Sequence, residues 1–283
     1  MAVVPELDTT EMVRAHRKNL PELGVWELLA RANWHGLKFT ESDVGLAKSL
    51  CAKALEIDPD NARIYASLSA CYAIDAAYGW RRPPTESHAM ALELAEKAVA
   101  LDKEDERTHL RLGTALLLAK RHEEAIQRYR TAIKLNPNYS IAMGQLGMVL
   151  VWAHKHDEAL ELLHKAMQLS PKDGNLIWYI IHVGWHHFIE KRYDEALMWA
   201  EKALYEEPKF PSGFRLKASA QGMLGNLAEA RVAYEQFDEI VPGATIAAMV
   251  EAMPFAYEDD ASASPRDCAA PGCRKSDFRV GSI

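Results

Sequence analysis

A period of 34 residues runs through the middle of the chain and limits the folds that it can adopt. The dipeptide Glu-Ala marks four copies of the repeat, at intervals of 34, 37 and 34 residues. A small residue precedes each of these alanines by twelve positions, and a proline follows each by twelve. A fixed period of this length is typical of a solenoid, in which identical supersecondary units stack on one another. The four alanines are Ala125, Ala159, Ala196 and Ala230.

The spacing within one period predicts a pair of packed helices. Leu112 and Leu116 fall on one helical face, with Gly113 beside them, so a partner helix can approach closely. On the partner, Ala125, Tyr129 and Ala132 share a face, as residues four and three apart do. Acidic pairs stand where each second helix would begin, because the helix dipole favours negative charge there, and a proline ends that helix. Since one pair cannot bury both of its faces, the pairs are expected to stack.

This pattern resembles the tetratricopeptide repeat over residues 24–242, with its Leu-Gly, Ala, aromatic, Ala and Pro positions. The resemblance implies an all-α fold, a right-handed α-solenoid of about six helix-turn-helix units over residues 23–243. The spacing of Ile246, Met249, Val250 and Met253 predicts a capping helix over 244–256. We expect an N-terminal segment over 1–22 with a short helix, and a disordered tail over 257–283, which has no apolar period.

A narrower resemblance links the chain to the repeat region of bacterial class III adenylate/guanylate cyclases. It rests on the runs 25–32, 39–40 and 54–59, on Gly79-Trp80, and on the closing run Met253-Pro254-Phe255. In that family a catalytic domain precedes the repeats, and here the repeats begin near residue 24. The resemblance therefore implies a regulatory part without its enzyme, which would act on a cyclase-type partner.

Composition favours a soluble cytoplasmic protein. The net charge is −7 and no basic stripe emerges, which argues against nucleic acid as a partner. The apolar runs near 141–153 and 176–189 are too short and too broken to cross a bilayer, so no membrane insertion is expected. Four cysteines in a chain of this length do not suggest a disulfide framework, and Cys51 and Cys71 stand at packing positions.

Residues that could carry chemistry are few. His182 and His186 are four apart on a predicted helix, a spacing that can hold a metal, but Trp185 and Phe188 interleave and no matching acidic set accompanies them. We interpret these histidines as helix contacts. Cys268 and Cys273 lack the second half of a zinc site. The sequence therefore predicts neither an enzyme nor a cofactor, with a metal-dependent enzyme as the weakest alternative.

The concave face of the array is the better candidate site. The resemblance implies that five positions of each first helix line this groove. The pattern here is apolar and aromatic, with a basic residue at each end, and it lacks the Lys and Asn set with which chaperone adaptors clamp a terminal carboxylate. We predict a protein or peptide partner; the alternatives are packing of these residues inside the superhelix, and a structural module that forms a homo-oligomer. The predicted partner-binding residues are Arg107, Leu110, Met148, Trp152, Trp178, Trp185, Phe188 and Arg215.

Overall fold

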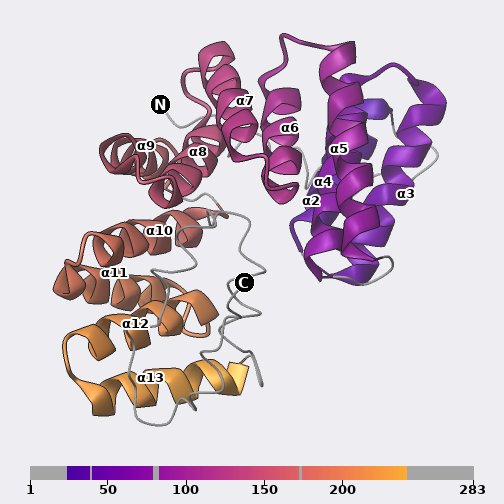
Figure 1. Cartoon of the computed structure of the whole chain (residues 1–283). Helices are drawn as coiled ribbons and strands as arrows, with labels where there is room; N and C mark the ends of the chain where they lie inside the picture. The colour runs from indigo at the N-terminus through magenta and orange to yellow at the C-terminus, as the bar shows by residue number, and fades with distance from the viewer. Residues whose placement is uncertain (1–23, 39, 79–82, 172–173, 241–283) are drawn as a thin grey trace, which may run out of the picture. The chain divides into compact units, whose positions relative to one another are not determined.

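The computed structural model describes residues 24–38, 40–78, 83–171 and 174–240, and this part of the chain contains helices and no strands. The twelve helices follow one another as six antiparallel pairs, joined by short turns (Figure 1). The first three pairs are α2 (Val25–Gly36) with α3 (Glu41–Ile57), α4 (Ala62–Tyr78) with α5 (Pro84–Leu101), and α6 (Glu106–Leu118) with α7 (His122–Leu135). The last three are α8 (Ser140–Trp152) with α9 (His156–Leu169), α10 (Leu176–Ile189) with α11 (Tyr193–Glu206), and α12 (Pro211–Met223) with α13 (Leu227–Ile240).

The chain divides into two compact units, one ending at Ala142 and one beginning at Met143, so that the boundary falls within α8. In the first unit, α2, α4 and α6 contact each other in succession, and each packs against its own second helix. In the second unit, α10 contacts α9, α11 and α12. Each unit therefore buries the faces of its pairs by stacking, as the period predicts.

Close helix contacts occur where the small residues of the repeat stand. A Cβ atom on Gly147 would lie 2.8 Å from Cγ of Leu163 and 3.1 Å from the carbonyl oxygen of Ala159, both on α9. A Cβ on Gly113 would lie 2.7 Å from the Tyr129 ring of α7. Real Cβ atoms essentially never come within 3.0 Å of such neighbours. The predicted role of these glycines, close approach of the second helix, is confirmed.

The buried faces of the second helices are also those that the sequence predicts. Ala125, Tyr129 and Ala132 of α7 have no exposed surface, and burial raises the pKa of the Tyr129 hydroxyl. Acidic residues occupy the first turns of α7, α9 and α11. In the first unit, Cys51 and Cys71 are buried free thiols, and burial raises the pKa of Cys71 to about 11. The cysteines therefore pack as small hydrophobic side chains.

The turns inside the last four pairs share one backbone design. Lys120, His154 and Lys191 have φ angles of 57°, 53° and 58°, and Gly225 has 84°. In each turn the next residue donates its backbone N–H to a carbonyl five residues back, for example Arg121 to Leu116 at 2.9 Å. This is the 6→1 bond of a Schellman motif, which satisfies a carbonyl at the end of the first helix. Three of these four left-handed positions carry side chains, although glycine adopts this conformation at lower cost.

Some of the sequence predictions fall outside the described residues. They are the N-terminal segment 1–22, the Gly79-Trp80 insertion, the capping helix 244–256 and the tail 257–283. These stay predictions. Among the described helices, none has the length and apolar character needed to cross a membrane.

Candidate functional site

Aromatic side chains from α8 and α10 gather in the second unit. The ring centroids of Trp152 and Trp185 are 5.9 Å apart, and Phe188 meets Trp185 edge-on at 5.5 Å. His182 meets Trp152 edge-on at 6.5 Å. Residues 182, 185 and 188 follow one another at spacings of three on α10, so each is a neighbour of the next on the helix surface. Trp152, His182, Trp185, Phe188 and Arg215 are called the Trp185 cluster below.

Arg215 brings a positive charge to this cluster from α12. The guanidinium carbon lies 5.1 Å from the centroid of the Trp185 ring, within the range of a cation–π interaction. Its Nε is buried and has no hydrogen-bond partner. Burial lowers the pKa of Arg215 to about 10, so the side chain still carries its charge at neutral pH. The cluster thus contains a cation whose Nε donor is unused.

His182 and Trp152 complete the polar groups of the cluster. His182 Nδ1 donates to the backbone carbonyl oxygen of Trp178 at 2.7 Å, and burial lowers the pKa of His182 to about 4. The imidazole is therefore neutral at pH 7 and adds no second charge. Trp152 Nε1 is buried without a hydrogen-bond partner, and an indole N–H can only donate. Both unused groups of the cluster, on Trp152 and Arg215, are donors.

Trp178 adds an exposed aromatic side chain to the same helix, α10. Its side chain is 40% exposed, and its ring meets Phe210 edge-on at 5.0 Å. Trp178 and Trp185 are seven residues apart on α10, which places them on the same helical face about two turns apart. The surface therefore runs along α10 from the half-exposed Trp178 to the buried Trp185.

The other predicted site residues take different positions. Leu110 and Met148 are buried, with 1% and 4% exposure, so they contribute packing rather than open surface. Trp185 is also largely buried, at 8% exposure, whereas Trp152, Phe188 and Arg215 are half-buried. Arg107 is half-buried at the start of α6, and its backbone N–H donates to Asp105. Arg107 and Leu110 belong to the first unit, and the six other residues belong to the second.

His186 of α10 belongs to a hydrogen-bonded chain with His156 of α9 and Glu190. His186 Nδ1 lies 3.2 Å from Nδ1 of His156, whose Nε2 lies 3.3 Å from Glu190 Oε1. Arg192 donates to His186 Nε2 at 2.8 Å, and burial, with the nearby charges, lowers the pKa of His186 to about 4. His182 points to a different partner, as described above. Within the described ranges, no group of three or more His, Cys, Asp or Glu side chains is arranged to hold a metal ion.

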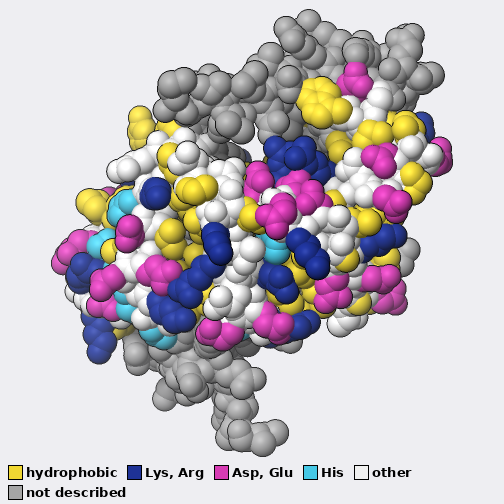
Figure 2. Space-filling view, turned by 90° about the horizontal axis from the view of Figure 1, so that it is seen from above, with side chains coloured by type: hydrophobic (Ala, Val, Ile, Leu, Met, Phe, Trp, Pro, Cys, Tyr) yellow, Lys and Arg dark blue, Asp and Glu magenta, His cyan; other side chains and the backbone are white. Residues whose placement is uncertain are grey.

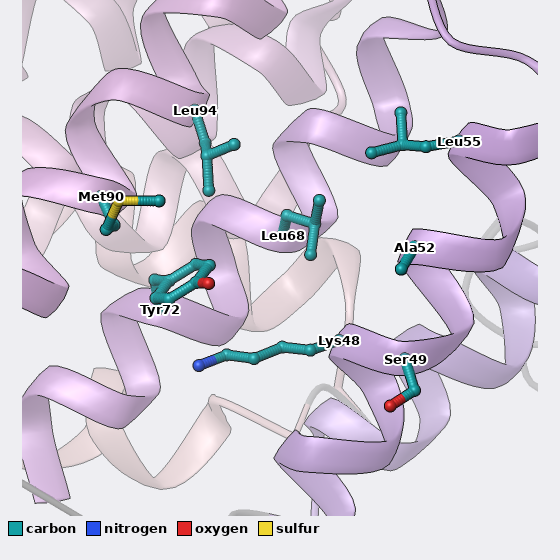
Figure 3. A pocket seen from close by; sticks show the side chains of 8 residues that line it. All are labelled: Lys48, Ser49, Ala52, Leu55, Leu68, Tyr72, Met90 and Leu94. Atoms are coloured by element: carbon teal, nitrogen blue, oxygen red, sulfur yellow. The ribbon is translucent and has the colours of Figure 1, made fainter. Parts of the chain in front are cut away.

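The first unit contains a groove that sequence reasoning did not find. Figure 3 shows its side chains, which come from α3, α4 and α5 and enclose about 390 Å³. Lys48 extends along its floor toward the Tyr72 ring, with Nζ 3.8 Å from the centroid, and forms an ion pair with the buried Asp75. The groove joins residues from three helices, so no single repeat carries a recognisable signal. Its lining is Lys48, Ser49, Ala52, Leu55, Leu68, Tyr72, Met90 and Leu94.

The described residues on the face drawn in Figure 2 give no sign of an interface of one charge. On the face in Figure 2, basic and acidic side chains are interspersed with hydrophobic ones among the described residues. A nucleic-acid interface usually shows a basic patch or stripe, and the described part of this face has none.

Comparison with protein families identifies the helix pairs from α6 to α11. Two family models of the tetratricopeptide repeat match, one over residues 106–139 and one over residues 139–204. The chain contains tetratricopeptide repeats. These matches cover α6 to α11 and include the helices that carry most of the Trp185 cluster.

One relative has a name that connects the repeats with an enzyme. "Putative adenylate cyclase 3" of Rhizobium meliloti (strain 1021) is 28% identical over 120 residues, which are 42% of this chain and 20% of that protein. The chain thus aligns with only one fifth of the length of this relative. The likeness agrees with the narrower resemblance seen in the sequence.

Solved structures share the fold of this tetratricopeptide-repeat chain. The Cut9 and Hcn1 hetero-tetramer of the APC/C matches with a TM-score of 0.69 at 15% identity, over 87% of this chain and 45% of that chain. Pseudomonas aeruginosa pilF matches with a TM-score of 0.56 at 23% identity, over 78% and 95%. A thermophilic tetratricopeptide-repeat protein of Thermus thermophilus matches with 0.54 at 21%, over 70% and 98%. At these identities the likeness concerns the fold.

Proposed function

We propose that this chain is a protein-interaction module whose partner peptide binds along α10, over Trp178 and the Trp185 cluster. Tetratricopeptide repeats generally mediate protein–protein interaction and typically act as non-enzymatic scaffolds. The observation that carries this placement is the half-exposed Trp178, at the open end of an aromatic surface that also holds a cation. Tryptophan and arginine are the residues most enriched among those that dominate binding energy at interfaces.

We further propose that the partner belongs to a cyclase-type signalling system in the cytoplasm. The likeness to a protein named as an adenylate cyclase supports this view, together with the sequence runs that resemble the repeat region of class III cyclases. Repeats of this kind would act on the output of a catalytic domain by binding it or a segment attached to it. If so, a protein with a cyclase catalytic domain is among those that the module retains.

The test uses an exposed aromatic residue so that folding and binding can be separated. The full chain and its Trp178→Ala variant are immobilised at equal amounts and used to capture proteins from the native cell. Tyr205→Ala is the matched control, because Tyr205 is an aromatic residue of α11 with 85% exposure. We expect Trp178→Ala to lose at least about 2 kcal/mol of binding, as a dominant interface residue does. Full retention of all partners by a folded Trp178→Ala variant would refute the placement.

Self-association is a second candidate, favoured by exposed hydrophobic side chains on second helices. Met198 is 55% exposed, Tyr205 85% and Val232 56%. Exposed hydrophobic side chains can form contacts between copies where they lie close together. Mass measurement in solution over a range of concentrations separates the two functions. A dimer that dissociates on Tyr205→Ala substitution but not on Trp178→Ala substitution would favour self-association.

A further inference from the structure

The guanidinium of Arg215 stands out among the charged groups of the second unit. The cation–π contact with Trp185 is the interaction that the structure gives it, with neither a hydrogen bond nor an ion pair among the described residues. Other basic side chains nearby are paired, since Lys217 of the same helix meets Glu201 at 3.2 Å. The buried Nε of this half-buried side chain is a donor without a partner, and such a donor costs free energy. Folding alone does not explain why a cation occupies this position.

We propose that the Trp185 cluster binds the carboxylate of an aspartate or glutamate side chain in the partner peptide. This inference rests on the proposed function, because it names the group that the aromatic surface recognises. The carboxylate accepts from Arg215 Nε and from Trp152 Nε1, the two buried donors without partners. Both side chains contact the same Trp185 ring.

Because both groups only donate hydrogen bonds, they favour a ligand that only accepts hydrogen bonds and carries a negative charge. Arginine and the tryptophan indole offer N–H groups and no acceptor, so a hydroxyl or amide ligand would leave part of its own capacity unused. An ionised carboxylate accepts from both and neutralises the guanidinium, and such charge-assisted bonds are roughly twice as strong as neutral ones. His182 is neutral at pH 7 and does not supply a second cation, so the cluster matches the single charge of a carboxylate. A phosphate group carries a larger charge than this cluster can balance.

The position of the cluster along α10 indicates an acidic side chain within a peptide rather than a chain end. Trp178 lies on one side of Trp185 and Phe188 on the other, ten residues apart. At a rise of about 1.5 Å per residue, these aromatic rings are spread over about 15 Å of helix. An extended peptide covers that length with about five residues. A ligand that contacts both aromatics therefore continues in both directions from the carboxylate, with apolar side chains on either side.

The experiment selects peptides on the full chain and compares two substitutions. A library of random peptides, displayed so that both peptide ends are covalently blocked, is selected in parallel on wild type, Arg215→Met and Trp152→Phe. The Met variant keeps a long side chain without charge, and the Phe variant keeps an aromatic ring without its N–H. Circular dichroism verifies that each variant is folded. For each selected peptide, affinity is measured again after Glu→Gln or Asp→Asn replacement.

Support for the inference has three parts. Peptides selected on wild type carry an acidic residue flanked by apolar residues. Amide replacement of that residue weakens binding to wild type about tenfold or more, which is the strength of a hydrogen bond to a charged group. The same replacement has less than about a twofold effect on Arg215→Met, and an intermediate effect on Trp152→Phe.

Two other outcomes distinguish failure of this inference from failure of the proposed function. If selected peptides lose binding on Trp178→Ala substitution but show no acidic preference, the surface binds peptides and the carboxylate assignment is overturned. If the selection yields no peptide that depends on Trp178, the proposed function fails, and this inference fails with it. Binders that require a free terminal carboxylate, obtained when the blocked ends are released, would also overturn the assignment to a side chain.

Discussion

The contact between α8 and α9 at Gly147 allows a quantitative test of the repeat packing. A methyl group at this position would lie 2.8 Å from Leu163 Cγ and 3.1 Å from the Ala159 carbonyl oxygen. Ordinary contacts begin at 3.4 Å, so Leu163 would have to move by at least about 0.6 Å. The Leu163 side chain is fully buried, and the Ala159 atom is a backbone carbonyl oxygen within α9. Neither neighbour can therefore move away easily.

Gly147→Ala is therefore expected to destabilise the protein. Overpacking of this kind costs about 1–3 kcal/mol, offset by the roughly 1 kcal/mol that alanine gains over glycine within a helix. The net loss should be about 0–2 kcal/mol, and Gly147→Leu should lose more. Gly36→Ala is the control, because nothing lies within 4 Å of a Cβ atom there. It should be neutral or stabilising by less than about 1 kcal/mol.

Urea unfolding followed by far-UV circular dichroism gives these differences, and a double-mutant cycle identifies their cause. In a Leu163→Ala background the Leu163 atoms that meet the new methyl group are removed, and only the Ala159 carbonyl oxygen remains. The cost of Gly147→Ala should then fall by about 1 kcal/mol or more, since contacting residues do not act additively. An unchanged cost in that background, or a stabilising Gly147→Ala in the wild type, would show that steric contact with α9 is not the reason for glycine here.

Three more predictions follow from the turns, the buried histidine and the Trp185 cluster. Lys120→Gly should stabilise the chain by up to about 1 kcal/mol, and Gly225→Ala should destabilise it similarly, because both residues have positive φ; thermal unfolding measures both. The pKa of His182 falls from 6.5 to about 4 on folding, so the unfolded chain binds the extra proton in that window and stability falls as pH drops through it. The loss is at most about 3–4 kcal/mol, and His182→Asn should remove this contribution to the pH dependence of stability, as measured by urea unfolding. Trp185→Ala should cost about 3–5 kcal/mol of stability because the ring is buried, whereas Tyr205→Ala should cost under about 0.5 kcal/mol, as chemical denaturation can show.

The sequence predicts the parts of the fold that depend on spacing within one repeat. The contacts of Gly113 and Gly147, and the burial of Tyr129, follow from residues that recur at fixed intervals, so the period contains enough information to place them. The left-handed turns were not predicted, because the backbone hydrogen bonds that fix them require no particular side chain at Lys120 or His154.

The candidate site shows the same division between repeated and individual features. Repeat positions indicate which residues of α10 share a face, and Trp178 and Trp185 do so. Burial of Trp185 and the unused donor of Arg215 depend on contacts between α8, α10 and α12, which belong to three successive repeats. Such contacts join positions about 30 residues apart whose identities differ from one repeat to the next. No spacing rule describes them.

The apolar character of α10 has a consequence for how the chain is made. This helix contacts α9, α11 and α12, and residues on several of its sides, including Tyr179, Ile180 and Val183, are buried. During synthesis it emerges well before α12 is available to cover it, and exposed apolar segments of incomplete chains are prone to aggregate. A shortened protein that ends after α10 or α11 would retain this exposed surface. Soluble fragments of the second unit should therefore extend at least to the end of α12 at Met223.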